Sequence, residues 1–501
     1  MTRISGADDI YDIRLFIICS CGRIKEDIMV RRQQTARKGK IMKKKIIIKT
    51  AAFVSAVLLS AGVVSLPVSQ DTGFAITAEA ASSKLAAPSY AFCSKKSSDS
   101  ATLMWGSVSG ADAYRVYKYN ASSKKYESYK TVKGTSCTVT GLKPGKSYSF
   151  KVAALKKSNG KYVAGTKSET VKVKTLKAFK AGDTVSCSLF SITLPAGADY
   201  VVEKEKNSIS VYDREAKESN WGGFAFNVTA YAKPSDYSGM MDAKIGEMTT
   251  SSGKVYDIVV RYPSDVQYDV EKYSDMPANY ENLYYGSEDI LKTLESKKGG
   301  SFAAGAGMKG EDLYGDVLAK YKTALSEKWD SNKLEEEDMS PVYNQIAQSE
   351  KGSMLSKVGY AYSDLNGDGI DELLIGEVAK GSKANMVYDI YTMVDRKPVH
   401  AASGWFRSSM YLFEYGMIAN VYSSSAYESG VRILEVVHNE AGLYTQQDFR
   451  CDYSADEENP WFIYYLDDEE GEKVSEEDFN QRMSNYGDFI HIDFTPFSSL
   501  K

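Results

Sequence analysis

Residues 364–372 are the one stretch of this 501-residue chain whose side chains are spaced for a definite chemistry, the binding of a hard cation. Carboxylate and amide side chains stand at positions 1, 3 and 5 of the stretch, so their oxygen atoms can converge on one ion. A glycine at position 6 permits the sharp turn, residue 7 would offer its main-chain carbonyl, and a glutamate follows at position 9. The predicted calcium ligands are Asp364, Asn366, Asp368, Ile370 and Glu372.

Two apolar segments, Val358–Tyr362 and Leu373–Gly376, flank this loop and predict strands on either side of it. A calcium-bound connection in an extracellular β domain suits that context better than a helix–loop–helix EF-hand. An EF-hand carries a bidentate glutamate at position 12, where this chain has Ile375, so we expect modest affinity for calcium. The alternative is a turn made by Asp, Asn and Gly residues that binds no metal.

The N-terminal residues read as a targeting segment. From Met42 onward, lysines at 43–45 and 49 form a positive region and Ala51–Val64 an apolar one, and Ala78-Glu79-Ala80 gives a cleavage pattern. We therefore predict a signal peptide over residues 42–80, behind a leader over 1–41 that belongs to an over-extended start. An uncleaved anchor is the alternative, but about 16 apolar residues fall short of a membrane span.

Cleavage after Ala80 would leave 49 basic and 59 acidic residues and a net charge of −10. An acidic exported protein is a poor candidate for nucleic-acid binding, and no stable membrane span is expected after signal removal. The four remaining cysteines match neither a disulfide framework nor a zinc spacing, so buried free thiols are expected, with a bridge between Cys93 and Cys137 as the alternative.

Residues 84–176 alternate short β-type runs with turn signals, which is typical of a β-sandwich. Trp105 falls on the second predicted strand and Tyr114–Tyr117 on the third. Residues 142–148 (Leu-Lys-Pro-Gly-Lys-Ser-Tyr) have the form of a tyrosine corner, in which the ring packs in the core and the hydroxyl bonds upstream backbone. This stretch resembles a fibronectin type III domain, a resemblance that implies a spacer or scaffold role.

Residues 179–298 predict an α+β domain. Strands are expected over Ser188–Leu194, Ser208–Tyr212, Gly223–Tyr231 and Val255–Tyr262, followed by a helix over Glu288–Glu295 capped by Ser287. Its Ile192–Pro195, Trp221–Phe224 and Tyr262–Asp269 phrases resemble exported Gram-positive proteins with a fold similar to the PsbP-type sandwich.

Residues 299–310 predict a flexible Gly-rich linker. It contains Gly305-Ala306-Gly307-Met308-Lys309-Gly310, formally a G-x-G-x-x-G sequence. A dinucleotide fingerprint requires a preceding strand within a βαβ unit, so we expect no nucleotide site there.

Residues 311–501 predict two helices, Glu311–Lys328 and one opening at Ser340-Pro341, followed by a β domain that carries the calcium-type loop. This order resembles the C-terminal parts of secreted clostridial proteins. Integrin-type β-propellers repeat the same loop in every blade, whereas this chain has one copy, so a complete propeller is not expected. The predicted fold is therefore multidomain, an all-β fibronectin type III sandwich followed by α+β domains with antiparallel sheets.

The sequence offers little for catalysis. Its three histidines, His400, His438 and His491, have no metal spacing, and no nucleophile elbow or phosphate loop occurs. We expect a secreted, non-catalytic binding or scaffold protein, released or held at the cell wall. Its expected partner is a cell-wall or environmental polysaccharide or a surface protein. The alternatives are a glycan-active hydrolase or its carbohydrate-binding subunit, and a soluble solute receptor.

Overall fold

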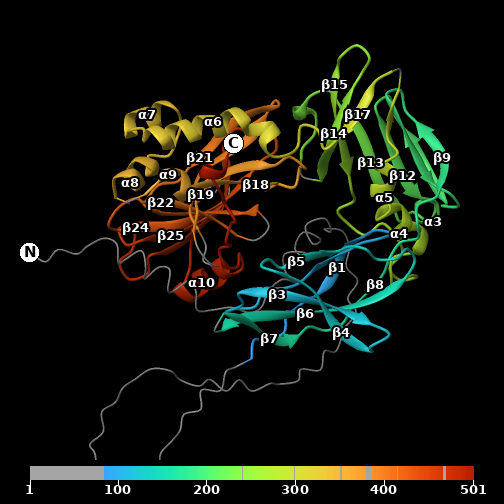
Figure 1. The fold of residues 1–501 in the computed structure, drawn as a ribbon, viewed down its shortest axis with the longest axis horizontal. Helices are drawn as coiled ribbons and strands as arrows, with labels where there is room; N and C mark the ends of the chain where they lie inside the picture. The colour runs from blue at the N-terminus through green and yellow to red at the C-terminus, as the bar shows by residue number, and fades with distance from the viewer. Residues whose placement is uncertain are drawn as a thin grey trace, which may run out of the picture.

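The computed structural model describes residues 84–500, except 159, 240, 298, 350–351, 380–384, 414–415 and 466–469. The predicted leader and signal peptide lie outside the described residues. The described chain forms three β-rich domains, and each lies beside the other two (Figure 1). Its sheets are antiparallel, and eight α-helices accompany them in the described part of the chain.

The first domain is a sandwich of two sheets, one with the strand order β1-β2-β5 and one with the order β4-β3-β6-β7, in which β8 also pairs with β6. Its strands are β1 (Phe92–Lys96), β2 (Ala101–Met104), β3 (Ala113–Asn120), β4 (Lys125–Val132), β5 (Ser136–Val139), β6 (Ser147–Ser158), β7 (Lys161–Lys167) and β8 (Val171–Lys174). Trp105 is buried between the sheets, and the Tyr148 hydroxyl accepts the Lys143 N–H at 2.7 Å. The tyrosine corner is confirmed.

The second domain has a six-stranded sheet in the order β11-β12-β13-β15-β14-β17 and a three-stranded sheet in the order β16-β10-β9. The strands are β9 (Ala181–Ser186), β10 (Phe190–Pro195), β11 (Tyr200–Lys204), β12 (Ser208–Asp213), β13 (Phe224–Tyr231), β14 (Asp242–Thr249), β15 (Val255–Arg261), β16 (Glu295–Ser296) and β17 (Ser301–Ala304). Short helices α3 (Arg214–Glu218), α4 (Ala278–Tyr284) and α5 (Ser287–Leu291) accompany them. Phe190, Phe226 and Leu283 are fully buried in the core between these elements.

The third domain is built on one eleven-stranded sheet in the order β27-β26-β25-β24-β23-β22-β20-β19-β18-β28, with β21 paired to β20. Its strands are β18 (Val358–Ser363), β19 (Glu372–Glu377), β20 (Val387–Val394), β21 (Lys397–Ser403), β22 (Ser408–Leu412), β23 (Ile418–Ser423), β24 (Glu428–Val436), β25 (Leu443–Asp452), β26 (Trp461–Tyr465), β27 (Glu472–Lys473) and β28 (Thr495–Pro496). Its helices are α6 (Glu311–Glu327), α7 (Ser331–Glu336), α8 (Val342–Ser349), α9 (Met354–Lys357) and α10 (Glu476–Ser484).

Four of these helices, α6 to α9, lie together on one side of the sheet, and α10 lies apart from them (Figure 1). Tyr314, Leu318 and Tyr321 of α6 face the sheet because they recur at helical spacing on one side of the helix, and all three are buried. The predicted Glu311–Lys328 helix is thus confirmed, and α7 and α9 are additions to the predicted pair.

The predicted flexible linker over 299–310 is wrong. Residues 301–304 form β17, which pairs with β14 at the edge of the second domain's sheet. A strand therefore does precede the G-x-G-x-x-G sequence, and α6 follows it. That strand pairs antiparallel, however, so it does not belong to a parallel βαβ unit. Helix α6 also starts with two acidic residues, Glu311 and Asp312, which would repel the phosphate of a nucleotide.

The helix predicted over 288–295 is also too long. Helix α5 ends at Leu291, and Glu295 begins β16. Ser287 is not its cap, because the Ser287 hydroxyl donates to the Tyr284 carbonyl at 2.7 Å. The chain turns early because β16 must reach β10, with which it pairs.

Candidate metal centre

The loop at residues 364–371 connects the two antiparallel strands β18 and β19, and the last ladder pair before it is Ser363 with Glu372. The two strands predicted from the apolar flanks are confirmed. The loop reverses direction through Gly367 and Gly369, whose φ angles of 79° and 89° lie in the left-handed region that favours glycine. Local sequence alone thus brings the five predicted ligands into one hairpin.

The side chains of the loop bond to its own main chain. The Asp364 carboxylate accepts the N–H groups of Gly367 at 2.8 Å and of Gly369 at 3.0 Å. Asn366 Oδ1 accepts the Asp368 N–H at 2.9 Å, and Asp368 Oδ1 accepts the Ile370 N–H at 2.7 Å. These are the bonds of an Asx-type turn. Each oxygen keeps a second lone pair, so the turn does not exclude a cation.

Glu372 points inward at the end of the loop. Its side chain is buried, with Oε2 accepting the Leu365 N–H at 2.8 Å and Oε1 accepting the Thr392 hydroxyl at 3.2 Å. Burial, and then the nearby charge of Asp368, raises the pKa of Glu372 well above its usual value. Burial and the same neighbour also raise the pKa of Asp364. The loop thus brings the carboxylates of Asp364, Asp368 and Glu372 close enough to influence one another.

These donors are chemically suited to a hard cation, because they are carboxylate, amide and main-chain oxygens without sulfur or ring nitrogen. Ile370 is the residue whose carbonyl would contribute. In the described chain, however, no three His, Cys, Asp or Glu side chains gather in an arrangement that could hold a metal ion. Cation binding would require Glu372 or Asp368 to turn from its present partners. Calcium therefore remains a prediction.

One side of the loop is accessible from solvent. A cavity of about 430 Å³ is lined by Asp364, Asn366 and Gly367 on one wall and by Leu412, Phe413 and Ile490 on another. Asp364 and Asn366 are half-buried and Gly367 is exposed, so an ion could reach the first two ligands from this side.

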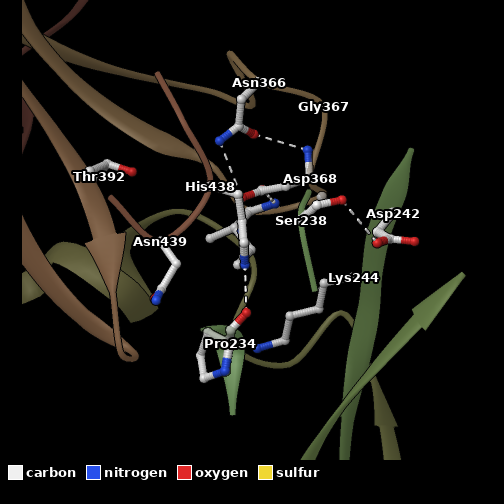
Figure 2. Close-up of polar contacts among 12 residues, drawn as sticks. Pro234, Ser238, Asp242, Lys244, Asn366, Gly367, Asp368, Thr392, His438 and Asn439 are labelled. Atoms are coloured by element: carbon white, nitrogen blue, oxygen red, sulfur yellow. Dashed lines mark hydrogen bonds and ion pairs between the residues drawn. The ribbon is translucent and has the colours of Figure 1, made fainter. Parts of the chain in front are cut away.

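The opposite side of the loop is covered by His438, which no spacing in the sequence indicated (Figure 2). Its Nδ1 lies 2.7 Å from Asp368 Oδ2, and its Nε2 lies 2.8 Å from the main-chain oxygen of Pro234. Both partners are acceptors, so the ring carries a proton on each nitrogen. Burial opposes that charge, but the bonds to Asp368 and Pro234 raise the pKa of His438.

The second domain also contacts the main chain of the loop. The Lys244 N–H donates to the Asp368 carbonyl at 2.6 Å, and the Asp371 N–H donates to the Met308 carbonyl at 2.8 Å. The loop is therefore part of the contact between the second and third domains. These partners lie more than 60 residues away in the sequence, so only the tertiary fold reveals them.

A second polar cluster surrounds Asp389, which is fully buried on β20. Its Oδ2 accepts the hydroxyls of Tyr343 at 2.5 Å and Tyr321 at 2.8 Å. Its Oδ1 accepts the Ser403 hydroxyl and lies 3.0 Å from His400 Nε2. Ser403, His400 and Asp389 have the residue types of a hydrolytic triad, in which the serine and the aspartate bond to different ring nitrogens of the histidine. Here both lie against Nε2 of His400, and the serine hydroxyl donates to the aspartate. This arrangement satisfies the buried carboxylate with hydrogen bonds and does not activate the serine as a nucleophile.

The described cysteines, Cys93, Cys137, Cys187 and Cys451, are free thiols. Cys137 and Cys187 are buried, as expected, whereas Cys93 and Cys451 are half-buried. No helix in the described ranges is long and apolar enough to cross a membrane.

Comparison with known proteins identifies the family of one domain. Residues 86–172 match the family model of the fibronectin type III domain. Among solved structures, the FN5 domain of Drosophila Lar is 23% identical in sequence. The match covers 19% of this chain and 99% of that chain, with a TM-score of 0.16. The fn3 domain of human collagen alpha-1(XX) chain is 19% identical, and the match covers 21% of this chain and 99% of that chain, with a TM-score of 0.17. None of the curated proteins matches the chain.

The first domain of this chain is therefore a fibronectin type III domain, in agreement with its two sheets and its tyrosine corner. The match spans residues 86–172 and does not extend to the second and third domains, which contain the loop and its contacts.

Proposed function

We propose that this chain is a secreted, non-catalytic modular protein that binds or organises other molecules outside the cell, with a third domain braced by calcium. The fibronectin type III domain supports the modular role, because this domain is a common binding and scaffold module of extracellular proteins. Export rests on the signal-type segment at residues 42–80, and the resemblance of the second domain to the PsbP-type fold remains part of the proposal.

The observation that carries calcium bracing is the burial of carboxylates in one short loop. Glu372 is buried, and the pKa of Asp364 and of Glu372 is raised, so the charges of these two carboxylates are unfavourable without a counter-ion, whereas Asp368 is paired with His438 at 2.7 Å. Ca²⁺ held by Asp364, Asn366, Asp368, Ile370 and Glu372 would supply that counter-ion and stabilise the native state by mass action. Free calcium at ten times the dissociation constant would add about 1.4 kcal/mol.

Thermal unfolding of residues 81–501 tests this bracing. The midpoint should rise in millimolar calcium relative to chelator, and magnesium should raise it less because it demands a tight octahedral shell. Asp364→Ala should abolish the rise. Asp371→Asn is the matched control, because this carboxylate lies in the same loop but pairs with Lys309 at 2.6 Å. Equal midpoints for the wild type in calcium and in chelator would leave the turn without a metal role.

The proposed partner is a cell-wall or environmental polysaccharide or a surface protein. A glycan array run beside a hydrolase panel on the same protein separates binding from catalysis. Binding without turnover supports the proposal. Turnover of any polymer that is lost on changing one carboxylate would instead establish a glycan-active hydrolase. Sequencing the N-terminus of the protein from culture medium tests export, for which a chain that begins near Ala81 is expected.

A further inference from the structure

Exposed aromatic side chains gather at one end of the third domain's sheet, on three loops that lie side by side. Trp405 and Phe406 belong to the β21–β22 loop, Tyr427 belongs to the β23–β24 loop, and Tyr453 directly follows β25. We call these four residues the aromatic rim. Tyr427 is 65% exposed, and the other three are 45–50% exposed. A single exposed ring is ordinary, but a contiguous group of them marks an interaction surface.

Main-chain hydrogen bonds join the three loops of the rim into one surface. The Ser423 N–H donates to the Arg407 carbonyl at 2.9 Å, and the Tyr453 N–H donates to the Tyr427 carbonyl at 2.9 Å. Within the β23–β24 loop, the Ser425 hydroxyl oxygen accepts the Tyr427 N–H at 3.1 Å. The backbone that carries the rings is therefore already ordered, so a ligand would bind without a large entropy cost for fixing the loops.

The rim lies at the end of the sheet away from the second domain. Strand β24 begins at Glu428 beside the rim and ends at Val436, and His438 follows at the opposite end, where it contacts Pro234 of the second domain. The rim crosses the neighbouring strands β22, β23, β24 and β25. Because adjacent strands lie about 4.8 Å apart, it is about 14 Å long. A row of that length suits a polymer chain better than a compact molecule.

The sheet face next to the rim carries paired charges. Arg432 of β24 lies opposite Asp448 of β25 in the ladder, while the other face of these strands packs with α10. The Arg450 guanidinium lies 2.8 Å from Asp448 and 3.9 Å from Glu428. Positive and negative groups thus compensate one another, and the half-buried Arg450 and Glu428 side chains stay within reach of a ligand. A surface without a dominant sign of charge favours an uncharged ligand.

We propose that the aromatic rim and the charged face beside it form a polysaccharide-binding surface, whose ligand is an uncharged polysaccharide chain. This inference rests on the glycan partner proposed above and gives that partner a site. A sugar ring presents C–H groups on its faces and hydroxyl groups around its edge. The faces pack on the rings of Trp405, Tyr427 and Tyr453, and the hydroxyl groups bond to Glu428 and Arg450.

Two other occupants fit this surface less well. An anionic membrane would be repelled by Glu457 and Glu458, which are exposed in the loop that begins with Tyr453. A protein interface has an apolar centre from which charged groups are depleted. Here the exposed Ser424 and Ser425 share a loop with Tyr427, and the charges of β24 and β25 lie directly beside the rings.

The test compares the two ends of β25. Tyr453→Ala removes a ring from the rim, and Tyr444→Ala removes a ring of equal exposure, 48% against 47%, from the other end of the strand. Depletion of residues 81–501 from solution by insoluble cellulose, chitin, mannan and starch gives a dissociation constant for each protein. For a polysaccharide that the wild type binds, Tyr453→Ala should weaken binding at least about tenfold, whereas Tyr444→Ala should bind as the wild type does.

Trp405→Ala should weaken binding by a similar factor, because its ring belongs to the same rim. Since Trp405 and Tyr453 lie on different loops, either variant decides the question if the other fails to fold. Equal dissociation constants for the wild type and both rim variants would overturn this site and leave polysaccharide binding by the chain intact.

The choice of ligand is tested on the wild type. Binding to none of the four polysaccharides, with a charged glycan bound on the array, would overturn the uncharged ligand and leave the proposed function standing. Silence in both assays would overturn the polysaccharide partner and the rim together. Vesicles of phosphatidylcholine and phosphatidylserine test a membrane role. Sedimentation of the wild type with these vesicles, lost in Tyr453→Ala, would assign the rim to a lipid surface and overturn the inference.

Discussion

At the scale of single residues, the buried carboxylates of the loop make a prediction about pH. Burial and the charge of Asp368 raise the pKa of Glu372 and of Asp364, and the bonds to Asp368 and Pro234 raise that of His438. In each case the folded protein holds the proton more tightly than the unfolded chain does. Stability should therefore increase as pH falls through the folded pKa values towards the unfolded ones.

In chelator, we expect the unfolding midpoint of the metal-free protein to rise between pH 7 and pH 5. Glu372→Gln should flatten the rise, because a neutral amide at this position no longer titrates. Ion-paired carboxylates with lowered pKa, such as Glu472 beside Arg482, lose their contribution only below this window. The measurement is thermal unfolding across the pH range. A midpoint that falls from pH 7 to pH 5 would show that these side chains do not control stability.

Calcium should reverse the trend, since it binds the deprotonated carboxylates. The same scan in calcium provides the control.

The candidate ligands could be predicted because their chemistry is local. Asp364, Asn366 and Asp368 are alternate residues of one turn, and a turn needs no distant partner. His438, Lys244 and Pro234 could not be predicted, because the fold brings them to the loop from other elements and their own surroundings in the sequence carry no pattern.

At the scale of elements, the prediction succeeded where apolar residues are concentrated. Strands β12, β13 and β15 were expected close to their observed bounds, because each contributes several buried apolar side chains. Strand β4 was missed, since all of its residues are exposed or half-exposed. Strand β17 was taken for linker because Ser-Phe-Ala-Ala has weak β propensity, and pairing with β14 overrides that weakness.

The loop that joins β18 and β19 offers a matched pair of glycines. Both Gly367 and Gly369 have positive φ, so alanine at either should cost about 1–2 kcal/mol in backbone strain. Gly369→Ala should cost about 1–3 kcal/mol more, because its Cβ would press on the Lys244 main chain, whereas Gly367 has open space. Urea unfolding of the two variants measures the difference. Equal losses would mean that the second domain does not press on the loop in solution.

At the scale of the whole molecule, the three domains are joined by two kinds of contact. The second and third domains share buried groups, including Asp257 and His438. The fibronectin type III domain instead meets its neighbours through ion pairs nearer the surface. Lys96 pairs with Glu281 of the second domain at 2.5 Å, and Lys133 pairs with Asp493 of the third at 2.8 Å. It is thus folded back against both (Figure 1).

Salt should separate these two kinds of contact. Raising ionic strength from 0.1 M to 1 M shortens the Debye length from about 10 Å to about 3 Å, which weakens exposed pairs far more than buried ones. Lys133 and Asp493 are 56% and 74% exposed, so little should hold this side of the domain in high salt. We expect the fibronectin type III domain to swing away while the other two stay docked, and the maximum dimension in small-angle scattering should increase.

Glu281→Lys should produce part of this extension at low salt, because it places two positive charges together at Lys96. Glu205→Lys changes the net charge equally at an exposed site in the same domain and should leave the scattering curve unchanged. A molecule with the same dimensions in 1 M salt and in the Glu281→Lys protein would show that apolar packing holds the first domain in place. An extended molecule would instead show that the ion pairs hold it, so that local ionic strength sets the reach of this module.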